Sequence, residues 1–534
     1  MASSDHNSDN EKQDEPQGSS FESTLLTGKK LGLVFMAFML GYSLVALDQT
    51  IISTALPTIA SKFQAVSDLS WIASAYFLPQ ATFMLFFGAL LRVLPPKGVL
   101  LVSISIFELG SVFCAVAPSV DFLIFGRAVA GLGGAGLWVT VITVMARMTT
   151  LEQRPIFMGL VGSFYAVSSV VGPLVGGAFT DHVSWRQVVR FKVVVIMRLT
   201  PMFPDVDVAD INLPIGALAI VAILFLLPNF PPPMVITTGF WQRIKNLDWI
   251  GTILSLAMVV SLLLPLQWGG NEKPWNAPEV IALLVLFIVL LVAFIVFEIK
   301  YGSNAVFPSK VLFRRNMIGA VIATAILHSA GLSSLQLLSA TITVGAIITK
   351  FGHPRPFLVA GPAIACIGFG LLFTVHQDTN AGKIAGFQIL VGLGLGFAIQ
   401  NTLVIAQTEF ASEQDLVPQA TSMITFIQLI GSAIGLAVFG AVFAGQIRSK
   451  LNSSGLPREV IQAVLGDIKI ISSLPTEQQN IVIPAYIDAV DHVFLVGIAA
   501  GALASLGACL IRRSRNVKDV GKIRNVEPVE MVAP

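Results

Sequence analysis

The sequence predicts an all-α polytopic membrane protein. Hydrophobic residues make up 54% of its 534 residues, charged residues make up only 12%, and the mean hydropathy is +0.79. Soluble domains carry about 25% charged residues, so this composition excludes an ordinary soluble protein. The apolar residues also fall into blocks of about 20 residues, the length that a helix needs to cross a bilayer.

The apolar blocks follow one another along the chain with short polar loops between them. Each block is long enough to span a bilayer as a helix. Charged residues, Pro or Gly separate one block from the next. A stretch at 316–350 is ambiguous and contributes one or two further spans, which gives 13 or 14 in all. The clear spans cover 31–57, 70–91, 98–117, 122–147, 156–180, 211–230, 246–268, 278–299, 356–376, 384–407, 418–443 and 490–511.

Basic residues in alternate loops predict the orientation of the spans. Lys and Arg concentrate in cytoplasmic loops of membrane proteins. They occur here before the first span and in the loops after the second, fourth, sixth and eighth spans, which share one side. The residues are Lys29, Lys30, Arg92, Lys97, Arg147, Arg154, Arg243, Lys245, Lys300, Lys310, Arg314 and Arg315.

The stretch 316–350 decides whether the later loops keep this pattern. As one helix, it would place Lys350, Arg355 and the basic C-terminal tail outside the cell. As a hairpin that turns near "HSAGLSS", it returns all of them to the cytoplasm. Each arm then has about 17 residues, the lower limit for crossing. The charge pattern favours the hairpin.

The segments outside the spans are expected to be tails and one long loop. Residues 1–28 are polar and acidic without an apolar signal core, which predicts a disordered cytoplasmic tail. Residues 512–534 are basic and predict a second cytoplasmic tail. Residues 444–489 are expected to form an extracellular loop, where Asn452 begins an Asn-Ser-Ser glycosylation signal.

Two pairs of segments indicate an internal repeat. "GRAVAGLGGAG" (126–136) matches "FQILVGLGLGF" (387–397), which aligns Arg127 with Gln388. About forty residues later in each half, "GPLVGGAF" (172–179) matches "GSAIGLAVF" (431–439), with glycines four residues apart. Duplicated membrane halves are typical of transporters, whose substrate sites lie where the halves meet.

The chain resembles the major facilitator superfamily, and within it the fourteen-span drug:proton antiporters of the fungal toxin and multidrug efflux type. "LDQTIISTALP" (47–57) is similar to the first-helix motif, "RAVAGLGGAG" (127–136) to the fourth-helix motif, and "GPLVGGAFTDHVSW" (172–185) to the fifth-helix antiporter motif. The resemblance covers about residues 30 to 515. It implies a major facilitator fold with two pseudo-symmetric six-helix bundles, at 29–230 and 301–511, and two extra central spans at 231–300.

Three charged residues lie within apolar spans, where such residues are costly and usually functional. Asp48 either ties the first helix to a neighbour or is a titratable group beside the translocation path. Arg127 keeps its proton and therefore needs an acceptor, for which Asp48 and Glu108 are the candidates. The resemblance implies a part in proton coupling for Arg127. Glu108 is either such a partner or faces a water-filled vestibule.

The motifs imply further roles for residues along the first, fourth and fifth helices. Glycines allow helices to approach closely, and Pro removes a backbone hydrogen bond, a combination suited to a helix that must move. The first-helix motif contributes Leu47, Thr50 and Pro57; the fourth helix contributes packing glycines Gly131, Gly133 and Gly134; and the fifth-helix motif contributes Gly172, Pro173, Gly176 and Gly177.

The substrate cavity is less well marked in the sequence. Trp71, Tyr76 and Gln388 are candidates for its lining, although aromatic residues near helix ends are also interface anchors. His328 is interpreted as a packing residue in an apolar region. The chain has 36 Phe and 5 Tyr, which suits a hydrophobic substrate. The cysteines, Cys114, Cys366 and Cys509, indicate neither a disulfide framework nor a metal site.

Besides the loop "GALLRVLPPKG" between the second and third spans, two segments depart from the family pattern. Residues 185–210 form an atypical insert before "INLPIGA", and 316–350 is shorter than the two full helices that the family has there. Errors in the gene model, such as a retained intron and a skipped exon, would produce both departures. A degenerate but real transporter would also produce them.

The sequence therefore predicts a monomeric, proton-coupled transporter that exports a small hydrophobic toxin, secondary metabolite or drug. It is expected to need no cofactor besides the proton gradient, and neither a nucleotide-binding motif nor a nucleic-acid-binding pattern occurs. An enzyme is not expected, because no nucleophile–base arrangement is evident. The plasma membrane is favoured over the vacuolar membrane. The alternatives are an importer or vacuolar carrier of amino acids or siderophores, and a non-transporting family member.

Overall fold

The computed structural model describes residues 26–63, 69–182, 212–232, 239–270, 273–302, 305–329, 337–466 and 468–512. The predicted insert at 185–210 and both predicted tails, apart from Leu26, Thr27, Gly28 and Arg512, lie outside these residues. So do the side chains of the helical residues 51–63 and of Pro173, Gly176 and Gly177.

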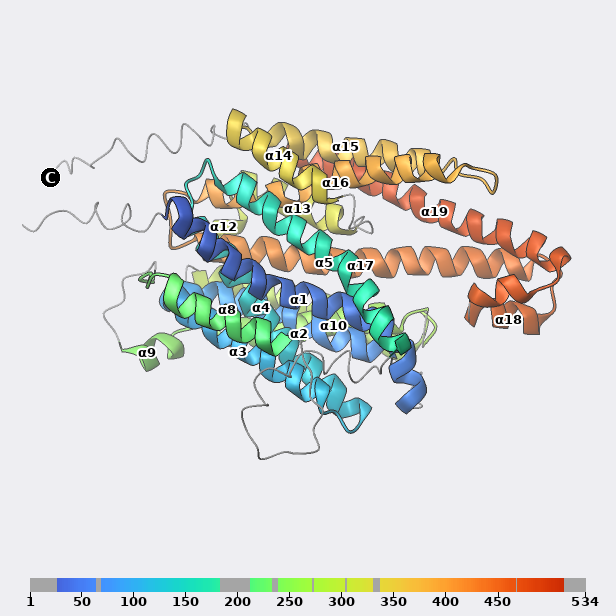
Figure 1. The fold of residues 1–534 in the computed structure, drawn as a ribbon, viewed down its shortest axis with the longest axis horizontal. Coiled ribbons are helices and arrows are strands. Elements are labelled where there is room, and N and C mark those ends of the chain that lie inside the picture. Colours follow the sequence, from blue (N-terminus) through green and yellow to red (C-terminus); the bar gives the residue numbers. More distant parts are fainter. Residues whose placement is uncertain are drawn as a thin grey trace, which may run out of the picture.

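The described chain is a bundle of helices whose long axes run roughly side by side (Figure 1). Ten of its helices are long and apolar enough to cross a membrane. α5, α8, α13 and α14 pack in the same bundle beside these ten. The helices of the first part are α1 (Gly28–Phe63), α2 (Leu69–Val93), α3 (Pro96–Ala115), α4 (Val120–Met148), α5 (Arg154–His182), α8 (Asn212–Leu226), α9 (Phe240–Lys245), α10 (Trp249–Trp268) and α11 (Pro278–Tyr301).

The second part of the chain continues with α12 (Ser309–Leu312), α13 (Arg315–Ser329), α14 (Leu337–Phe351), α15 (Arg355–Leu372), α16 (Ala381–Glu409), α17 (Val417–Asn452), α18 (Arg458–Gly466), the 3-10 helix η5 (Ile468–Ser473) and α19 (Thr476–Cys509). Region 316–350 thus forms two helices, as the charge pattern predicted. At 15 residues each, α13 and α14 are about 22 Å long, which is shorter than a typical bilayer core.

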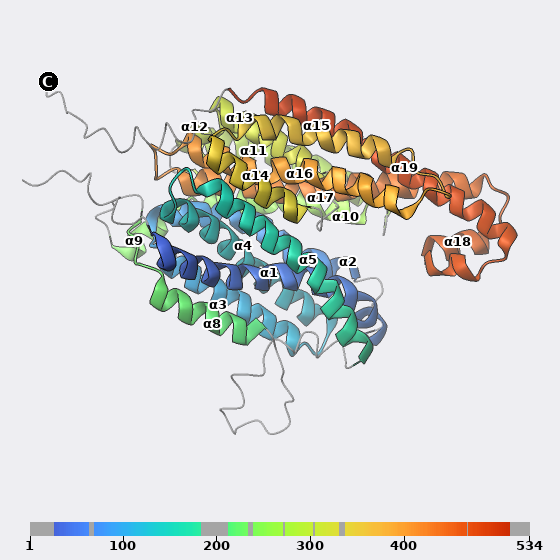
Figure 2. The same cartoon turned by 45° about the horizontal axis from the view of Figure 1, so that its top comes forward.

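The helices form two bundles with the same internal packing, and the two lie one above the other in Figure 2. In the first bundle, α3 packs on α4, α1 on α5, and α1 on α8. In the second bundle, α15 packs on α16, α13 on α17, and α13 on α19. These equivalent pairs show the pseudo-symmetry that the repeat predicted, because the same three helix pairings occur in both halves.

The two bundles meet through two equivalent helix pairs, α2 with α17 and α5 with α14. Both pairs are in backbone contact near one end. A Cβ on Gly88 of α2 would lie 2.5 Å from Ser422 Cβ, and a Cβ on Gly345 of α14 would lie 3.0 Å from Ile156 Cα. An ion pair between Arg92 and Asp415, 3.7 Å long, joins the halves at the same end. The halves are therefore closed at this end.

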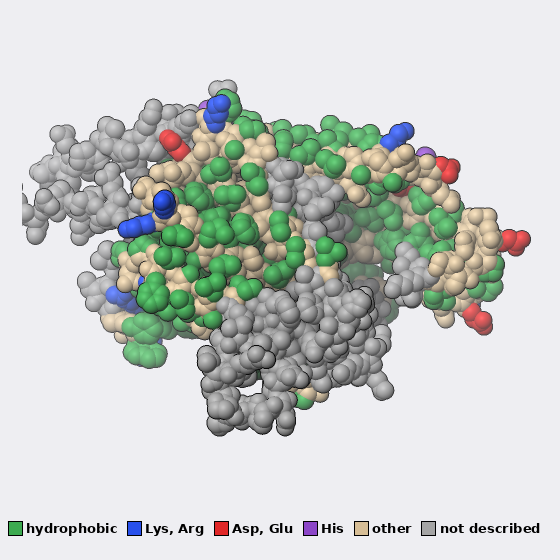
Figure 3. Space-filling model, in the orientation of Figure 1, with side chains coloured by type: hydrophobic (Ala, Val, Ile, Leu, Met, Phe, Trp, Pro, Cys, Tyr) green, Lys and Arg blue, Asp and Glu red, His purple; other side chains and the backbone are tan. Residues whose placement is uncertain are grey.

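By the positive-inside rule, the closed end is expected to be the cytoplasmic end. Figure 3 shows most of the Lys and Arg side chains at one end of the visible face and most of the acidic side chains at the other. Gly88 and Gly345 lie toward the basic loops after α2 and α14. The opposite end, where α17 meets α18 and α19, is accordingly the outer end.

Residues 444–489 are mostly helical, which corrects the predicted extracellular loop. α17 continues to Asn452, α18 and η5 follow, and α19 already begins at Thr476. Apolar residues from these helices bury one another outside the expected spans, among them Leu451, Val464 and Val482. The hydropathy pattern missed these helices because their apolar residues are spaced as one face of a helix, separated by polar residues.

The two central spans attach to the seam between the halves. α10 packs on α2, α17 and α11. α11 exposes most of its surface, including Ile288 and Val289, as a helix in contact with lipid does. Trp71 of α2 stacks edge-on against Trp268 of α10, with ring centroids 6.1 Å apart. α10 is therefore part of the wall where the halves meet.

The cytoplasmic end of α10 is fixed by Asp248. Its carboxylate accepts hydrogen bonds from Gly251 N at 2.7 Å and from Val306 N at 3.3 Å, so it caps α10 and holds the segment after α11. Ala305 O in the same segment accepts a bond from Gln419 of α17 at 2.9 Å. Burial raises the pKa of the Asp248 carboxyl above its usual value, while the two backbone hydrogen bonds lower it.

Candidate translocation site

A buried ion pair joins α1 to α4. Arg127 is 1% exposed and Asp48 is 3% exposed, and Arg127 Nη1 donates to Asp48 Oδ2 at 2.5 Å. Arg127 Nε also donates to Ile72 O at 3.3 Å, so the guanidinium reaches α2 as well. A charge removed from water is costly unless it is paired, and here the two charges compensate each other.

Tyr76 and three glycines complete the surroundings of Arg127. The guanidinium lies over the Tyr76 ring, 4.5 Å from its centroid, in a cation–π contact. A Cβ on Gly131 would lie 2.9 Å from Tyr76 C, and a Cβ on Gly134 would overlap the Tyr76 hydroxyl. On another face of α4, a Cβ on Gly133 would lie 2.6 Å from Phe107 Cα. The glycines thus admit α2 and α3 to backbone contact with α4.

Glu108 occupies a different place from Asp48. It is buried on α3, and a Cβ on Gly216 of α8 would lie 2.7 Å from its carboxyl carbon. Of the two carboxylates considered as partners for Arg127, the structure pairs it with Asp48. The vestibule role for Glu108 has no support in this geometry, since its carboxylate is buried against α8.

The first-helix and fifth-helix motifs lie on two helices that pack together. Thr50 Oγ1 bonds to Ala46 O in its own helix at 2.9 Å and to Ser168 O of α5 at 3.3 Å. Leu47 is half-buried on the same helix and Gly172 is buried on α5. The helical ranges of α1 and α5 include Pro57, Pro173, Gly176 and Gly177, whose side chains lie outside the described set.

A cavity of about 340 Å³ lies between the two halves beside the ion pair. Its first wall consists of Tyr42, Gln49, Phe77, Gln80, Met84, Trp138, Gly162 and Tyr165, and its second wall consists of His328, Ile399, Gln400, Thr425, Gln428, Leu429 and Ser432. A volume in this range fits a drug-sized ligand. No Asp, Glu, Lys or Arg is among these described lining residues, so the cavity suits a neutral compound.

Aromatic rings and amides define the chemistry of this central cavity. The rings of Tyr42 and Trp138 lie 4.8 Å apart, and Tyr165 stands edge-on to Trp138 at 6.2 Å. Gln49 accepts a bond from the Tyr165 hydroxyl at 3.3 Å and donates to Gln80 at 3.4 Å. Such a wall offers flat apolar contact and hydrogen bonds to a ligand.

The ion pair and the cavity are connected through neighbouring residues. On α1, Asp48 contacts Arg127 while Gln49, the next residue, lines the cavity. On α2, Tyr76 contacts Arg127 while Phe77, the next residue, lines the cavity. A change in the ion pair that rotated or shifted either helix would therefore move a wall of the cavity.

The residues expected to line the cavity lie elsewhere. Trp71 packs on α10, Tyr76 lies under Arg127, and Gln388 is exposed on α16. Sequence reasoning missed Tyr42, Trp138 and the cavity glutamines, because single amides and aromatic rings in apolar helices carry no pattern. His328 was interpreted as a packing residue. It lines the cavity, with Nδ1 3.0 Å from Thr324 O.

Asn452 and the described cysteines complete the predicted sites. Asn452 is exposed at the outer end of α17, where α18 follows. No disulfide joins Cys114, Cys366 and Cys509. Among the residues that the structure describes, no group of three His, Cys, Asp or Glu side chains could hold a metal ion.

Comparison with known proteins gives consistent matches along the chain. A model of the Major Facilitator Superfamily matches residues 38–199. The efflux pump aflT of Aspergillus parasiticus is 35% identical over 515 residues, covering 91% of this chain and 96% of that protein. The MFS-type efflux pump MFS1 of Arthroderma benhamiae is 34% identical over 513 residues, covering 90% of this chain and 91% of that protein.

Solved structures share the fold at low sequence identity. The proton:xylose symporter XylE superposes with a TM-score of 0.56 at 10% identity, covering 94% of this chain and 99% of that one. The human organic anion transporter MFSD10 superposes with a TM-score of 0.54 at 12% identity, covering 91% of this chain and 100% of that one. These similarities concern the arrangement of the helices.

Proposed function

The chain belongs to the major facilitator superfamily, and from this premise we propose that it is an efflux transporter for a small, neutral, largely apolar organic compound, driven by proton entry. The curated relatives named above are efflux pumps, and they match it over nine-tenths of its length. The importer alternative has no comparable support among them.

The observation that carries the proposal is the shared position of the ion pair and the central cavity. A transporter that exchanges a proton for a substrate needs a titratable group whose state alters the substrate site. Asp48 is that group in this proposal, because it pairs with Arg127 and precedes Gln49 in the cavity wall. A proton bound to Asp48 removes the charge attraction to Arg127, so the two compete for one carboxylate.

The class of substrate follows from the cavity lining. The aromatic rings of Tyr42, Trp138 and Tyr165 offer stacking surfaces, and the amides offer hydrogen bonds without net charge. An ionised substrate would lose its hydration without gaining an opposite charge among the described lining residues. Neutral aromatic toxins, secondary metabolites and drugs have the required chemistry.

The movement that we propose is a rocking of the two halves about the central cavity. The halves touch at α2–α17 and α5–α14, and in this structure those pairs are closed at the cytoplasmic end. Opening that end while the outer end closes would expose the cavity to the cytoplasm. Binding there, followed by the reverse movement, would carry the compound outward.

The remaining features of the proposal concern the setting of the protein. We expect a monomer in the plasma membrane, with the vacuolar membrane as the alternative site. We expect glycosylation at Asn452, which lies on the outer end of α17 in an exposed position. No cofactor enters the proposed cycle, whose energy source is the proton gradient.

The test uses the full-length chain in a yeast host that lacks its own drug pumps. Tritiated fluconazole serves as the probe, because it is neutral and carries three small aromatic rings. Cells with the transporter should accumulate less probe than cells with an empty vector, and a protonophore should remove the difference. Higher accumulation would indicate an importer, and equal accumulation would contradict export of this class of compound.

A further inference from the structure

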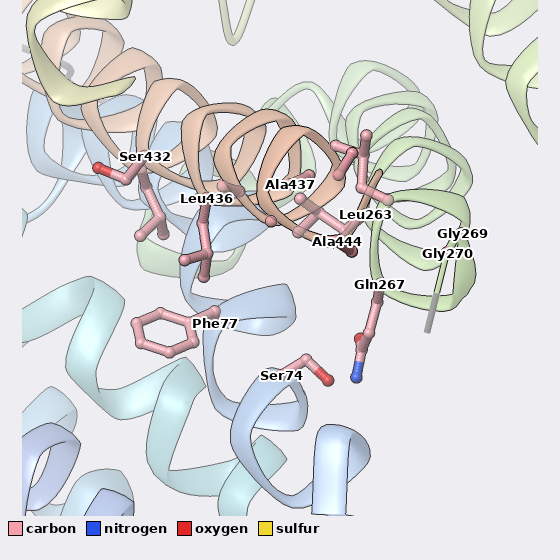
Figure 4. Close-up of a pocket in the computed structure, with 15 residues that line it drawn as sticks. Ser74, Phe77, Leu263, Gln267, Gly269, Gly270, Ser432, Leu436, Ala437 and Ala444 are labelled. Atoms are coloured by element: carbon pink, nitrogen blue, oxygen red, sulfur yellow. The ribbon is translucent and has the colours of Figure 1, made fainter. Parts of the chain in front are cut away.

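A second cavity of about 360 Å³ lies outside the substrate site already described, between α2, α10 and α17. Figure 4 shows it from within, with α17 above, α10 at one side and α2 below. The volume again fits a drug-sized ligand. We refer to it as the seam pocket, because it lies where the two halves and the first of the two central spans meet.

The lining of the seam pocket is apolar with a few hydrogen-bonding groups. Leu263 and Leu266 of α10 face Leu436 and several small residues of α17. The polar side chains are Ser74, Gln267 and Ser432, and Figure 4 shows the Gln267 side chain extending from α10 toward Ser74 on α2. No Asp, Glu, Lys, Arg or His is among these described lining residues, so this pocket also suits a neutral compound.

Three residues belong to both cavities. Phe77, Leu429 and Ser432 line the seam pocket and the central cavity. The two cavities are therefore separated by a wall that is one side chain thick at these positions. Phe77 is half-buried, and Figure 4 shows its ring on α2 below Ser432 and Leu436 of α17.

The seam pocket lies on the outer side of the central cavity. α17 rises from its cytoplasmic start at Val417, contributes Thr425 to Ser432 to the central cavity, and contributes Leu429 to Ala444 to the seam pocket. Ala444 lies twelve positions after Ser432, a rise of about 18 Å along a helix. α10 contributes only its last turns, from Leu263 to its end and the following Gly269 and Gly270.

We propose that the seam pocket is a second binding station for the exported compound, through which it leaves the central cavity toward the outer leaflet. The inference rests on the proposed function for its direction. It is carried by the common wall at Phe77, by the matching neutral and apolar chemistry of the two cavities, and by the outward position of the second. It assigns a function to α10, which provides one wall of the station.

Gly440 offers a direct way to fill the seam pocket. It lines the pocket on α17, and a Cβ built on it meets no atom within 4 Å. The first atom of a Gly440→Leu side chain therefore has open space at the pocket, where the larger side chain would compete with a ligand. Gly445 provides the matched control, because it lies on the same helix, is equally open, and does not line the pocket. Both substitutions replace Gly within a helix, so their effects on helix propensity are alike.

Two measurements on the full-length protein separate this inference from the proposed function. Equilibrium binding of tritiated fluconazole to purified protein in nanodiscs should give two sites in wild type and Gly445→Leu, and one in Gly440→Leu. Export from the yeast host should fall by about tenfold in Gly440→Leu, because the compound loses the apolar surface that it buries in the seam pocket. In Gly445→Leu, export should fall by less than about twofold.

Equal binding and equal export by the two variants would overturn the inference while leaving export itself intact. Two-site binding that Gly440→Leu reduces to one, without any export by wild type, would support the pocket and contradict the proposed function. Absence of binding to wild type would overturn both.

A second pair of variants covers the case in which Gly440→Leu does not fold. In a chain whose three cysteines are replaced by Ala, Ala444→Cys places a thiol in the seam pocket after folding, and Gly445→Cys places one beside it. Modification with N-benzylmaleimide should block export only at position 444, and bound fluconazole should slow that modification. Equal export after modification at both positions would contradict the inference.

Discussion

Arg127 and Asp48 are not equivalent members of their pair. A guanidinium keeps its proton under all conditions that a protein meets, whereas a carboxyl group can become neutral by binding one. If Arg127 is removed, Asp48 can protonate and remain buried without a charge. If Asp48 is removed, Arg127 keeps a buried charge that has lost its carboxylate. The structure thus predicts different outcomes for the two substitutions.

Arg127→Ala should abolish proton-dependent export while the protein still reaches its membrane. Asp48→Asn should abolish export and also reduce the amount of folded protein, because breaking a buried pair on this side costs about 3–5 kcal/mol. Immunoblots of membrane fractions and probe accumulation measure the two effects separately. Normal export by Arg127→Ala would show that the ion pair takes no part in proton coupling. Equal membrane levels of Arg127→Ala and Asp48→Asn would contradict the predicted difference in folding between the two variants.

The candidate site was predictable only in part at the level of residues. The sequence marks Asp48, Glu108 and Arg127, because charges in apolar spans are rare. Which carboxylate meets Arg127 depends on the rotation of α1 and α3 about their axes, and this is not encoded in spacing. The repeat aligned Gln388 with Arg127, yet Gln388 is exposed, so the second half has no counterpart of the pair at that position.

The fourth helix shows how a glycine pattern sets helix packing. Gly133 of α4 lies against the backbone of Phe107 on α3, and Gly394 of α16 lies against that of Ala365 on α15, where an added Cβ would be 2.8 Å from Ala365 Cα. These glycines are aligned in the internal repeat. The repeat therefore preserves a backbone contact between equivalent helix pairs, even where its polar residues differ.

Gly133→Ala and Gly394→Ala should each destabilise the protein by about 1–3 kcal/mol, the usual cost of overpacking. Gly32→Ala is the control, because a Cβ at this exposed position of α1 meets no atom within 4 Å. Thermal unfolding of the purified proteins in detergent measures the effect as a lower midpoint. Unchanged midpoints for both variants would mean that α3 and α4, and likewise α15 and α16, are not in backbone contact at these glycines.

Helix boundaries were predictable from hydropathy where the helix crosses the bilayer and not beyond it. α11 begins at residue 278 as expected, and α5 differs from its predicted span by two residues at each end. α17 continues nine residues past its expected end, and α19 begins fourteen residues early. The extensions are stabilised by side-chain packing among Leu451, Val464 and Val482, which a bilayer criterion does not detect.

The two halves of the molecule meet mainly at α2–α17 and α5–α14, with smaller contacts of α17 with α4 and of α16 with α5. Predicting that there are two halves required only the repeat and the span pattern. Predicting which helices join them required the family resemblance or the structure, because α2–α17 and α5–α14 are far apart in sequence and equally apolar. The state of the molecule, closed at one end, is visible in the contacts of Gly88 and Gly345 and in the ion pair between Arg92 and Asp415.

A cross-link between Gly88 and Ser422 should hold the molecule in this state. A Cβ on Gly88 would lie 2.5 Å from Ser422 Cβ, so a small separation of α2 and α17 reaches the 3.5–4.5 Å of a disulfide. In a chain without its native cysteines, Gly88→Cys with Ser422→Cys should lose export on oxidation and regain it on reduction. Each single variant should be insensitive to oxidant. Full export by the oxidised double variant would show that the cytoplasmic end need not open.

The buried pair also has a consequence for biogenesis. Ribosomes deliver helices in chain order, so α1 enters the membrane with Asp48 before α4 arrives with Arg127. α1 is inserted first, and its Asp48 can bind a proton. α1 can therefore remain in lipid as an uncharged segment until α4 is inserted. The later helix carries the permanent charge and finds its acceptor already in place. Because Asp48 precedes Arg127 along the chain, the arginine does not enter the membrane before its carboxylate partner. Exchanging the two residues would be expected to delay insertion, even if the final ion pair were identical.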